Sequence, residues 1–527
     1  MSRFPVETRT NKDAREALIR GMNVVADAVS ATLGPKSRNV AINQAAGAPK
    51  IIHDGVSVAK SIDLADPFED MGAQLLKEVA IKTNEVAGDG TTTSTILAQE
   101  LVNLGNELIV SGANPMTLKV ELEEACKFVI TELQKLARPV KDTEEIEKVA
   151  SISSASPEIG KIVAEAIEKV GKHGIIDVEL GKGSETEIEY KQGMEIDRGY
   201  KSPYFVTNQD TVEAEIENPY ILLTDKKINN ALDIGTFLNN FLKADVGRNL
   251  VIIGEVEEEA LATLVLNNLK KVINVVAIQP PAFGARQVDE LEDLAILTGG
   301  TVIKSESGRS LETVTIEELG RADKVRSDRD KTVILGGQGN KALLEQKITE
   351  LQKQVDKANT GYDAAIKKQR LAKLVGGVAV IKVGGITEVE LFDKKERVID
   401  AISAAKASVE EGIVAGGQIS FLAVAQLPDW PKTPGAELLK RALKKPFKVL
   451  MSNTGLDYAE VLGQITPIEY PRGMDVNDGE VKDLIENGVI DPLKVSRSAL
   501  ENAVSIAGMA FTTSVLISEP YKAIETK

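Results

Sequence analysis

Apolar residues recur at helical spacing near the start of the chain. One stripe advances by four, three, four and four positions, through Leu18, Met22, Val25, Val29 and Leu33. That spacing keeps the five side chains on one face of a helix. Gly34-Pro35 then ends the predicted helix, because glycine accepts a left-handed cap and proline cannot continue a helix. Further helices are predicted over about 70–86 and from Thr91 onward.

The middle of the chain, about 190–377, alternates short apolar runs with helical stretches. The runs are Leu250–Ile253, Val272–Ile278 and Thr301–Ile303, and the helical stretches are 256–270 and 286–298. Such alternation predicts a small parallel or mixed sheet covered by helices. Residues 341–374 are charged and periodic, which indicates a helix or a helix pair. A strand over Val378–Val383 and mostly helical residues to about 515 complete a multidomain α/β pattern with helical ends.

Composition narrows the class of protein. With 527 residues the chain is too long for one ordinary domain, and about three are expected. The formal net charge of −16 argues against a dedicated nucleic-acid-binding protein, whose binding surface is basic. The sequence shows no signal-like start, no long apolar run and a single Cys126, so we expect a cytoplasmic protein with no membrane partner. Two histidines, His53 and His173, leave little for zinc clusters or Ser-His-Asp triads.

The segment Gly88–Thr93 is the strongest candidate for chemistry. It lies between two predicted helices, where glycines let the backbone approach a ligand and the N–H groups of a helix start bind anions. Asp89 would repel a phosphate unless a divalent cation joins them, as in Mg²⁺-nucleotide sites. For these residues alone, an ordinary turn with a threonine cap is the alternative.

Other candidates are weaker on their own. No Gly-Lys pair is followed by Ser or Thr, so a Walker-type ATPase is not expected. Asp400 lies two positions from Val398 and from Ile402, away from the predicted buried stripe, which favours a solvated carboxylate for this residue alone. Acidic neighbours are expected to raise the pKa of the Cys126 thiol and to leave it unreactive.

Together the motifs closely resemble those of the group I chaperonins, the GroEL-type protein-folding machines. The matching blocks are Thr32–Lys36, Asp54–Ala59, Ala87–Thr93, Asp197–Tyr200, Ser202–Phe205, Leu374–Ile381, Val409–Gly412, Gly416-Gly417 and Asp491-Pro492. Their order and spacing make the resemblance specific. It implies an ATPase that captures non-native polypeptides on an apolar apical surface and encapsulates them for folding under a ring-shaped co-chaperonin lid.

The resemblance also implies three domains with discontinuous boundaries. They are an equatorial ATP-binding domain of 1–135 and 411–527, a small intermediate domain of 136–191 and 378–410, and an apical domain of 192–377. Family members are homo-oligomers of seven-membered rings, usually two rings stacked back to back. A closed ring requires heterologous, head-to-tail contacts.

For the nucleotide site, the resemblance implies ATP or ADP with Mg²⁺, and K⁺ as a further candidate ion. Asp54 and Asp400 are the implied catalytic carboxylates, which orient or deprotonate the attacking water, and Asp89 is the implied Mg²⁺ ligand. Because Asp400 belongs to the intermediate segment, we expect domain closure to deliver it. The other implied nucleotide contacts are Thr32, Leu33, Gly34, Pro35, His53, Gly90, Thr91, Thr92, Thr93, Ser153, Gly416, Gly417, Asp475, Val476, Val489 and Asp491.

For the apical domain, the resemblance implies an exposed apolar strip that binds misplaced apolar surface without reading sequence. Its residues are Tyr200, Ser202, Tyr204, Phe205, Leu238, Leu261, Val265 and Leu266. Without the resemblance, Leu261–Leu266 would be assigned to the core. Gly193 and Gly377 fall at the two chain crossings into the apical domain and are the implied hinges.

The sequence departs from the family pattern at several positions. His53 replaces the usual lysine before the first catalytic aspartate, Gln418 the usual third glycine, and Gly235 an apical leucine. Asp475-Val476-Asn477 stands where the family has Asn-Ala-Ala, and the tail lacks Gly-Gly-Met repeats. These changes leave open the nucleotide affinity, the client range and the strength of the lid contact.

Two other functions fit part of the pattern. A passive holding oligomer would need no ATP cycle, whereas the presence of Asp54, Asp89 and Asp400 favours a cage that hydrolyses ATP. A group II chaperonin would carry a built-in lid, and the apical region has no insertion of that size. The clients, the organism and the choice between one ring and two stay open.

His53 generates a pH-dependent prediction. An imidazole with a pKa of about 6.5 replaces a permanent cation beside Asp54, at the implied phosphate end of the nucleotide. Nearby negative charge raises that pKa in the ATP-bound state, and rising pH still removes the cation. We expect ATP affinity to fall between about pH 6 and 8.5 and His53→Lys to flatten the profile. Parallel profiles for the two proteins would instead indicate a side chain turned to solvent.

Overall fold

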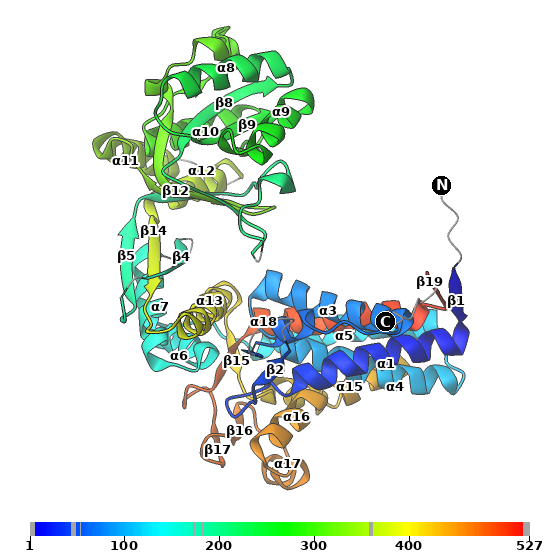
Figure 1. Cartoon of the computed structure of the whole chain (residues 1–527). Helices are drawn as coiled ribbons and strands as arrows, with labels where there is room; N and C mark the ends of the chain where they lie inside the picture. The colour runs from blue at the N-terminus through cyan, green and yellow to red at the C-terminus, as the bar shows by residue number, and fades with distance from the viewer. Residues whose placement is uncertain are drawn as a thin grey trace. The chain divides into compact units, whose positions relative to one another are not determined.

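The structure is a computed structural model that describes residues 6–43, 49–52, 54–171, 174–181, 183–209, 211–357 and 362–519. The chain divides into two compact units (Figure 1). The first joins both chain ends, Met1–Glu165 and Phe392–Lys527, and the second is the middle of the chain, Ala166–Leu391. The predicted multidomain α/β class is confirmed. The three-domain division stays a prediction, since the boundary between the two units falls inside the implied intermediate domain.

Helices dominate the first unit. They are α1 (Asn11–Ser30), α2 (Gly55–Lys60), α3 (Pro67–Ala87), α4 (Thr91–Val110), α5 (Pro115–Leu136), α6 (Thr143–Ser154), α14 (Ile419–Ala425), α15 (Pro434–Ala442), α16 (Lys445–Thr454), α17 (Tyr458–Ile465) and α18 (Leu493–Thr512). Two helices cross the unit boundaries, α7 (Pro157–Val170) and α13 (Glu388–Glu411). Among the described residues, every helix is too short or too polar to cross a bilayer.

Short antiparallel strand pairs complete the first unit. They are β1 (Glu7–Thr10) with β19 (Val515–Ser518), β2 (Val40–Ile42) with β3 (Lys50–Ile52), β15 (Ile413–Ala415) with β18 (Ile490–Pro492), and β16 (Arg472–Asp475) with β17 (Glu480–Asp483). The β15–β18 pair brings Asp491 beside Val414. Residues more than 70 positions apart in the sequence are thereby held together.

The core of the first unit depends on a very close crossing of α1 and α3. A Cβ added to Gly21 would lie 1.7 Å from the carbonyl oxygen of Glu69, and one added to Gly72 would lie 2.0 Å from that of Leu18. The two backbones therefore touch, which only glycine permits. This contact orients α3, whose C-terminal end leads into α4.

The predicted N-terminal helix ends earlier than its apolar stripe. Leu18 to Val29 are buried on α1 as expected, but the helix stops at Ser30 and Leu33 packs in a different apolar cluster. Side chains donate hydrogen bonds to the backbone carbonyl oxygens that would accept from N–H groups in a longer helix. Thr32 Oγ1 donates to the Val29 carbonyl oxygen at 2.8 Å, and Asn453 Nδ2 donates to the Ser30 carbonyl oxygen at 2.9 Å.

The second unit contains two sheets. The larger has eight strands: β6 (Gly193–Ile196), β7 (Ala214–Glu217), β8 (Tyr220–Ile228), β9 (Asn249–Val256), β10 (Asn274–Ile278), β11 (Val302–Ile303), β12 (Gly320–Ser327) and β13 (Thr332–Gly337). The smaller has the order β4 (Ile175–Leu180), β14 (Val378–Val383) and β5 (Glu187–Lys191). Both sheets mix parallel and antiparallel pairs, as predicted.

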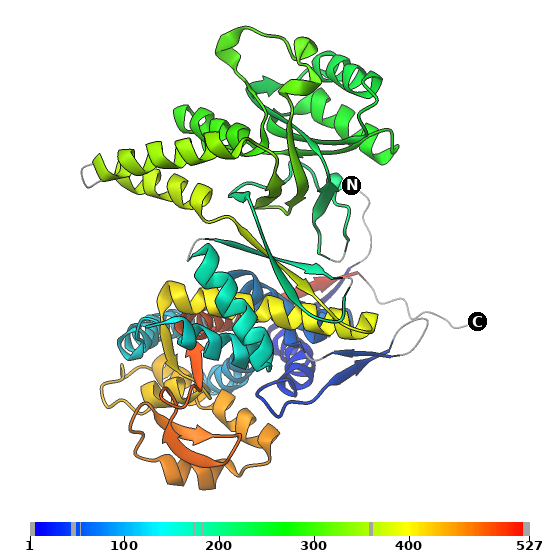
Figure 2. The ribbon, with the colours of Figure 1, turned by 90° about the vertical axis from the view of Figure 1, so that its left-hand side faces the viewer.

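Helices of the second unit follow the predicted alternation. They are α8 (Ala231–Lys243), α9 (Glu258–Leu269), α10 (Ala285–Thr298), α11 (Lys341–Lys357) and α12 (Tyr362–Val375). Single 3₁₀ turns lie at Pro203–Phe205, Ser305–Ser307, Leu311–Thr313 and Ile316–Glu318. The charged run 341–374 is a helix pair, α11 and α12 (Figure 2).

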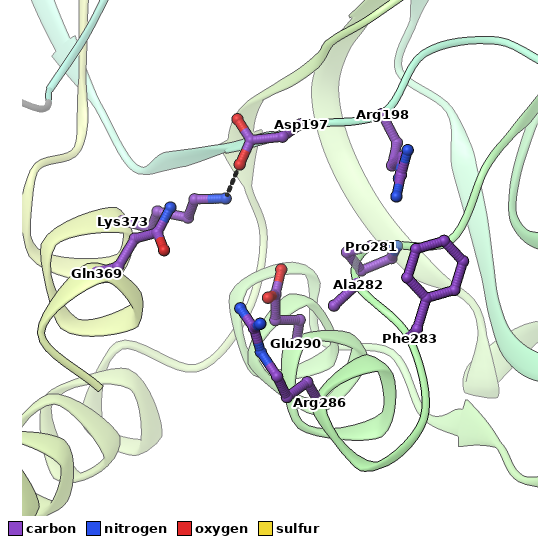
Figure 3. A pocket seen from close by; sticks show the side chains of 9 residues that line it. All are labelled: Asp197, Arg198, Pro281, Ala282, Phe283, Arg286, Glu290, Gln369 and Lys373. Carbon is purple, nitrogen blue, oxygen red and sulfur yellow. Dashed lines mark hydrogen bonds and ion pairs between the residues drawn. The ribbon is translucent and has the colours of Figure 1, made fainter. Parts of the chain in front are cut away.

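A charged hollow of about 290 Å³ lies among α10, α12 and the segment after β6 (Figure 3). Lys373 Nζ and an Asp197 carboxylate oxygen form an ion pair of 2.7 Å across it. The guanidinium of Arg198 lies 5.0 Å from the centre of the Phe283 ring. Charges of both signs therefore line this hollow.

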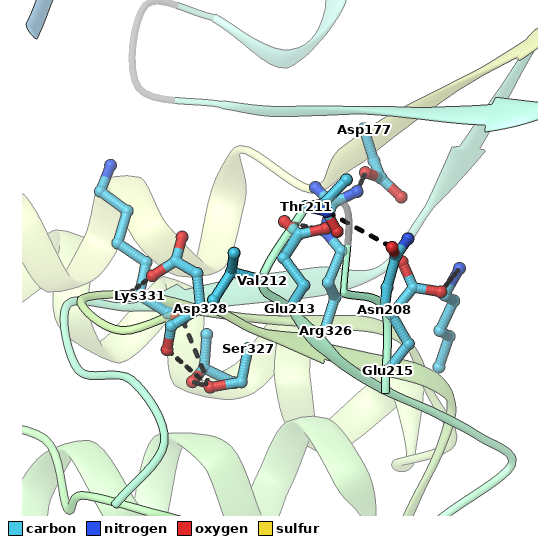
Figure 4. A network of polar contacts seen from close by, with 12 residues as sticks. Asp177, Asn208, Thr211, Val212, Glu213, Glu215, Arg326, Ser327, Asp328 and Lys331 are labelled. Carbon is cyan, nitrogen blue, oxygen red and sulfur yellow. Dashed lines mark hydrogen bonds and ion pairs between the residues drawn. The ribbon is translucent and has the colours of Figure 1, made fainter. Parts of the chain in front are cut away.

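A buried ion pair joins the two sheets of the second unit. Asp177 on β4 has no exposed surface, and its carboxylate lies 2.5 Å from the guanidinium of Arg326 on β12 (Figure 4). The same guanidinium lies 3.5 Å from Glu213. Beside this pair, Lys324 on β12 lies 3.4 Å from Glu179 on β4. Strand β12 is thus held to the small sheet by charge.

Removing one partner of this pair should loosen the junction of the two sheets. Arg326→Met leaves Asp177 as an unpaired buried charge, which costs about 3 kcal/mol or more. Asp177→Leu combined with Arg326→Met should recover most of that loss. Hydrogen exchange of the β4 and β12 amides in the full chain measures both effects. Lys227→Met, which breaks the exposed pair with Glu257, is the control and should leave exchange unchanged, whereas equal losses in the single and double variants would refute the coupling.

Candidate functional site

The start of α4 presents free backbone N–H groups. Gly88, which caps α3, and Gly90 both have left-handed backbones, with φ of 67° and 82°. Glycine adopts this conformation without a Cβ penalty, so the chain can leave α3 and begin α4 at Thr91 within three residues. The first N–H groups of a helix have no partner inside it, and together with the helix dipole they attract anions.

Asp89 lies at the centre of this turn. Its carboxylate accepts hydrogen bonds from the Gly90 backbone N–H and, at 3.3 Å, from the Ser153 hydroxyl on α6. Burial nevertheless raises the pKa of Asp89, and the charge of Asp54 raises it further. A cation bound beside the Asp89 carboxylate would offset this cost.

Asp54 approaches the same helix start from another segment. It caps α2 by accepting hydrogen bonds from the Val56 and Ser57 N–H groups at 3.2 and 2.8 Å. The neighbouring Gly55 lies against α4, since a Cβ there would be 2.6 Å from Thr92 Oγ1. Capping thus holds the carboxylate in place while the glycine allows the close approach.

Asp400 on α13 completes the group, so the solvated interpretation of this residue is wrong. A Cβ on Gly88 would lie 2.0 Å from the Cβ of Ser403, which is one helical turn from Asp400. The Asp400 side chain is half-buried. Its pKa is raised well above the usual range, first by burial and then by the charges of Asp89 and Asp54. Asp400 lies in the same compact unit as Asp89, and its delivery by domain closure stays a prediction.

A fourth carboxylate, Asp491, lies behind Gly416. A Cβ added to Gly416 would be 3.1 Å from Asp491 Oδ1, and the Gly416 N–H donates to the Val489 carbonyl oxygen at 2.9 Å. Burial raises the pKa of Asp491 to about 7, and the charge of Asp89 contributes. Gly417 follows with a left-handed backbone, φ 60°.

The segment Thr32–Pro35 borders the site on another side. Thr32 Oγ1 and Thr92 Oγ1 are 2.9 Å apart, and Gly34 has a φ of 91°. Leu33, Val476 and Val489 pack in one apolar cluster. The structure therefore brings together the segments of the implied nucleotide site, and the role of each residue stays a prediction. His53 lies outside the described residues.

Three polar residues that support the site were not among the candidates. Lys36 Nζ donates to the Val476 carbonyl oxygen at 2.7 Å, and Asn453 Nδ2 donates to that of Leu33 at 3.0 Å. Lys482 lies 2.8 Å from Asp475 Oδ2. Lys36 could have been chosen because it ends the first matching block, whereas Asn453 and Lys482 carry no signal in the sequence.

The described side chains of the site bring together negative charge that a bound cation would offset. In the described part of the chain, none of Asp54, Asp89, Asp400 and Asp491 forms an ion pair with Lys or Arg within 4.0 Å. No cluster of three His, Cys, Asp or Glu suited to a metal occurs there either. Mg²⁺ commonly takes only one or two carboxylates and completes its shell with phosphates and water. The donor set fits a magnesium-bound phosphate better than a metal alone.

The expected apolar strip of the second unit is only partly exposed. Tyr204 and Leu266 are exposed by 65% and 54%, and Asn268 Nδ2 links their segments by donating to the Tyr204 carbonyl oxygen at 3.4 Å. The expectation of exposure is wrong for four side chains, which are buried because they pack in the core or against the 3₁₀ turn: Tyr200, Ser202, Phe205 and Leu238. Leu261 and Val265 are half-buried. Leu269, exposed by 57%, extends the strip and was missed.

Both implied hinge positions require glycine, for different reasons. Gly377 has a left-handed backbone with a φ of 59°. A Cβ on Gly193 would lie 2.4 Å from Val378 Cγ2 and 2.5 Å from the Ile334 carbonyl oxygen. Rotation about these residues stays a prediction.

Comparisons with known proteins agree with this organisation. The sequence matches the model of the TCP-1/cpn60 chaperonin family over residues 25–236 and 242–520. The fold is similar to that of the chaperonin gp146 from the bacteriophage EL 2 (Pseudomonas aeruginosa), crystallised in the presence of ATP-BeFx. Crystal form II gives a TM-score of 0.72 at 22% identity and covers 97% of this chain and 98% of that one. Form I gives 0.64 at 22% identity and covers 97% and 99%.

The raised pKa of Asp491 predicts how stability depends on pH. The folded state holds the proton up to about pH 7, whereas the unfolded chain releases it near 3.8, so stability is lost as pH rises through this window. The free energy of unfolding of Asp491→Asn, relative to that of the wild type, should therefore rise by about 2 kcal/mol between pH 5 and 8. Urea unfolding without Mg²⁺ or nucleotide, followed by the fluorescence of Trp430 in the same unit, measures this. A constant difference across the range, as expected for the exposed control Glu85→Gln, would contradict it.

Proposed function

Because the chain belongs to the TCP-1/cpn60 chaperonin family, its role is that of a chaperone, and we propose that ATP hydrolysis at the start of α4 drives it. The observation that carries this proposal is the approach of Asp54, Asp89, Asp400 and Asp491 to the N–H groups that open α4. In the described part of the chain none of the four forms an ion pair with Lys or Arg, although the charge of Arg397 acts on Asp400. That the phage chaperonin gp146 was crystallised in the presence of ATP-BeFx supports the choice of nucleotide.

Binding of Mg-ATP would use the α4 helix start and Asp89. The N–H groups of Thr91–Thr93 can donate to phosphate oxygens, and the left-handed Gly90 leaves them room. When bound, Mg²⁺ neutralises charge on the phosphates and offsets the repulsion between them and the carboxylates. Asp89 is suited to hold the ion because Ser153 and Gly90 fix its orientation.

Hydrolysis requires a group that positions a water molecule and takes its proton. Asp400 has a raised pKa, which makes its carboxylate a better proton acceptor near neutral pH than an ordinary aspartate. Asp54 is held rigidly as the cap of α2, which suits it to orient the water. We assign the proton-accepting role to Asp400 and the orienting role to Asp54.

The carboxylate cluster also weighs against a passive holding oligomer. Half-buried carboxylates that repel one another destabilise a fold unless a ligand offsets the cost. A scaffold without an ATP cycle would gain nothing from this arrangement. The same argument favours Mg²⁺ as the accompanying ion.

For client capture, we propose the exposed side chains Tyr204, Leu266 and Leu269. Clustered apolar surface of this kind binds the apolar segments that non-native polypeptides expose. In this proposal the lid docks on the same surface, and seven chains close each ring through head-to-tail contacts. Encapsulation then follows from ATP-driven rotation about Gly193 and Gly377.

The two aspartates should fail in different ways. Asp400→Ala should bind Mg-ATP but turn it over at least tenfold more slowly, because it loses the proton acceptor. Asp89→Ala should weaken Mg-ATP binding itself, because it loses the magnesium ligand. Phosphate release measures turnover, and calorimetry measures binding. Asp429→Ala, in an exposed loop, is the control. Unchanged turnover in Asp400→Ala would show that Asp400 is not the proton acceptor. Absence of phosphate release from the wild type would instead support the passive holding oligomer.

The capture surface should be separable from the ATPase. Tyr204→Glu or Leu266→Ser adds a charge or a hydroxyl to the apolar strip and should abolish arrest of an aggregating client, measured by light scattering. Lid binding should weaken as well, while phosphate release continues. Leu343→Ser, with 52% exposure on α11, is the matched control. Full arrest of the client by both variants would show that these side chains do not take part in capture.

A further inference from the structure

We propose that Gln418 is a positioning residue of the nucleotide site and directs the hydroxyl proton of Thr93 toward the bound phosphates. The inference rests on the proposed ATP site. It concerns a residue that departs from the family pattern and that was not among the predicted site residues.

The backbone of Gln418 is strained. Its φ is 64°, directly after Gly417 with a φ of 60°. A side chain with a Cβ is disfavoured in this left-handed region, where glycine would be at ease. Strained residues that persist tend to lie at functional sites, where the side chain compensates for the backbone cost.

The side chain does not serve its own helix. Gln418 is the residue before α14, but its side chain forms no hydrogen bond that caps this helix. Instead its amide Nε2 donates to Thr93 Oγ1 on α4 at 3.1 Å. The hydrogen bond of this side chain is therefore made to the proposed site and not to its own helix.

This contact determines what the Thr93 hydroxyl can do. A threonine hydroxyl has one proton and can accept as well as donate. Because Thr93 Oγ1 accepts from Gln418, its own proton is left for another acceptor. The hydroxyls that follow behave differently, since Ser94 and Thr95 donate back to the Thr91 carbonyl oxygen at 2.8 and 2.7 Å.

The position of Thr93 makes a phosphate oxygen the natural acceptor. Thr93 is the third residue of α4 and only 7% exposed, so its proton cannot readily turn to bulk water. No hydrogen bond from it to a protein acceptor is formed in the described ranges. Phosphate oxygens accept hydrogen bonds, and those held by the N–H groups of the same helix turn would be within reach.

The other end of the amide, Gln418 Oε1, has no protein donor among the described residues. Gln418 Oε1 is buried and forms no hydrogen bond in the described structure. A buried carbonyl oxygen without a donor is costly. Phosphate oxygens cannot donate to it, but water held in the magnesium-phosphate shell can. With ligand present, each end of the side chain can therefore form a hydrogen bond.

A four-protein calorimetric comparison with Mg-ATP tests the inference. The proteins are the wild type, Gln418→Gly, Thr93→Val and the double variant. Gln418→Gly should raise the unfolding temperature, because it relieves the left-handed strain, and yet weaken Mg-ATP binding about 5- to 10-fold. Thr93→Val should weaken binding at least as much. The double variant should be no weaker than Thr93→Val, because Gln418 acts through that hydroxyl.

Thr93→Ser is the conservative control and should bind close to the wild type, since it keeps the hydroxyl. Binding by Gln418→Gly as tight as that of the wild type would overturn the inference alone, and so would losses that add in the double variant. A wild type that does not bind Mg-ATP would overturn the proposed function and the inference with it. A merely structural role predicts lost stability in Gln418→Gly, the opposite of the expected rise.

Discussion

Mutual repulsion among half-buried carboxylates at the start of α4 is the constraint on which the first unit depends. Asp54, Asp89, Asp400 and Asp491 come from four segments, and packing forces them toward the start of one helix. Burial raises the pKa of the last three, and the charge of a neighbouring aspartate adds to each. The core of the unit must supply the free energy that this arrangement costs. Binding of a cation together with an anion would offset this cost.

Close backbone contacts make that packing rigid enough to hold the charges. At Gly21 and Gly72 a Cβ would overlap the facing carbonyl oxygen. At Gly88 it would overlap Ser403, and this contact ties α13, with Asp400, to the turn that carries Asp89. Glycine thus acts where two backbones meet, and a methyl group at any of these positions would push the site apart.

In the second unit, opposite charges hold two sheets together. Asp177 and Arg326 form a buried pair between two sheets that share only two chain crossings. Such a pair is costly to bury and more costly to break on one side, so it favours a single docking geometry. The exposed Tyr204 lies in a 3₁₀ turn, and the exposed Leu266 and Leu269 lie on α9. The residues of the buried pair and those of the proposed capture surface are therefore different.

The sequence by itself determined the elements and the family. Periodicity sets helices and strands locally, as in α4, the α11–α12 pair and β14, because each depends on neighbours a few positions apart. The ordered motifs identified the chaperonin fold and the segments of the site. Only the tertiary structure decided which side chains are exposed and which are buried. Phe205 and Leu238 have the same apolar character as Leu266 but are buried, and Asp400 has the pattern of a solvated residue but meets three other segments. Burial and pKa depend on contacts between residues hundreds of positions apart, which no local pattern encodes.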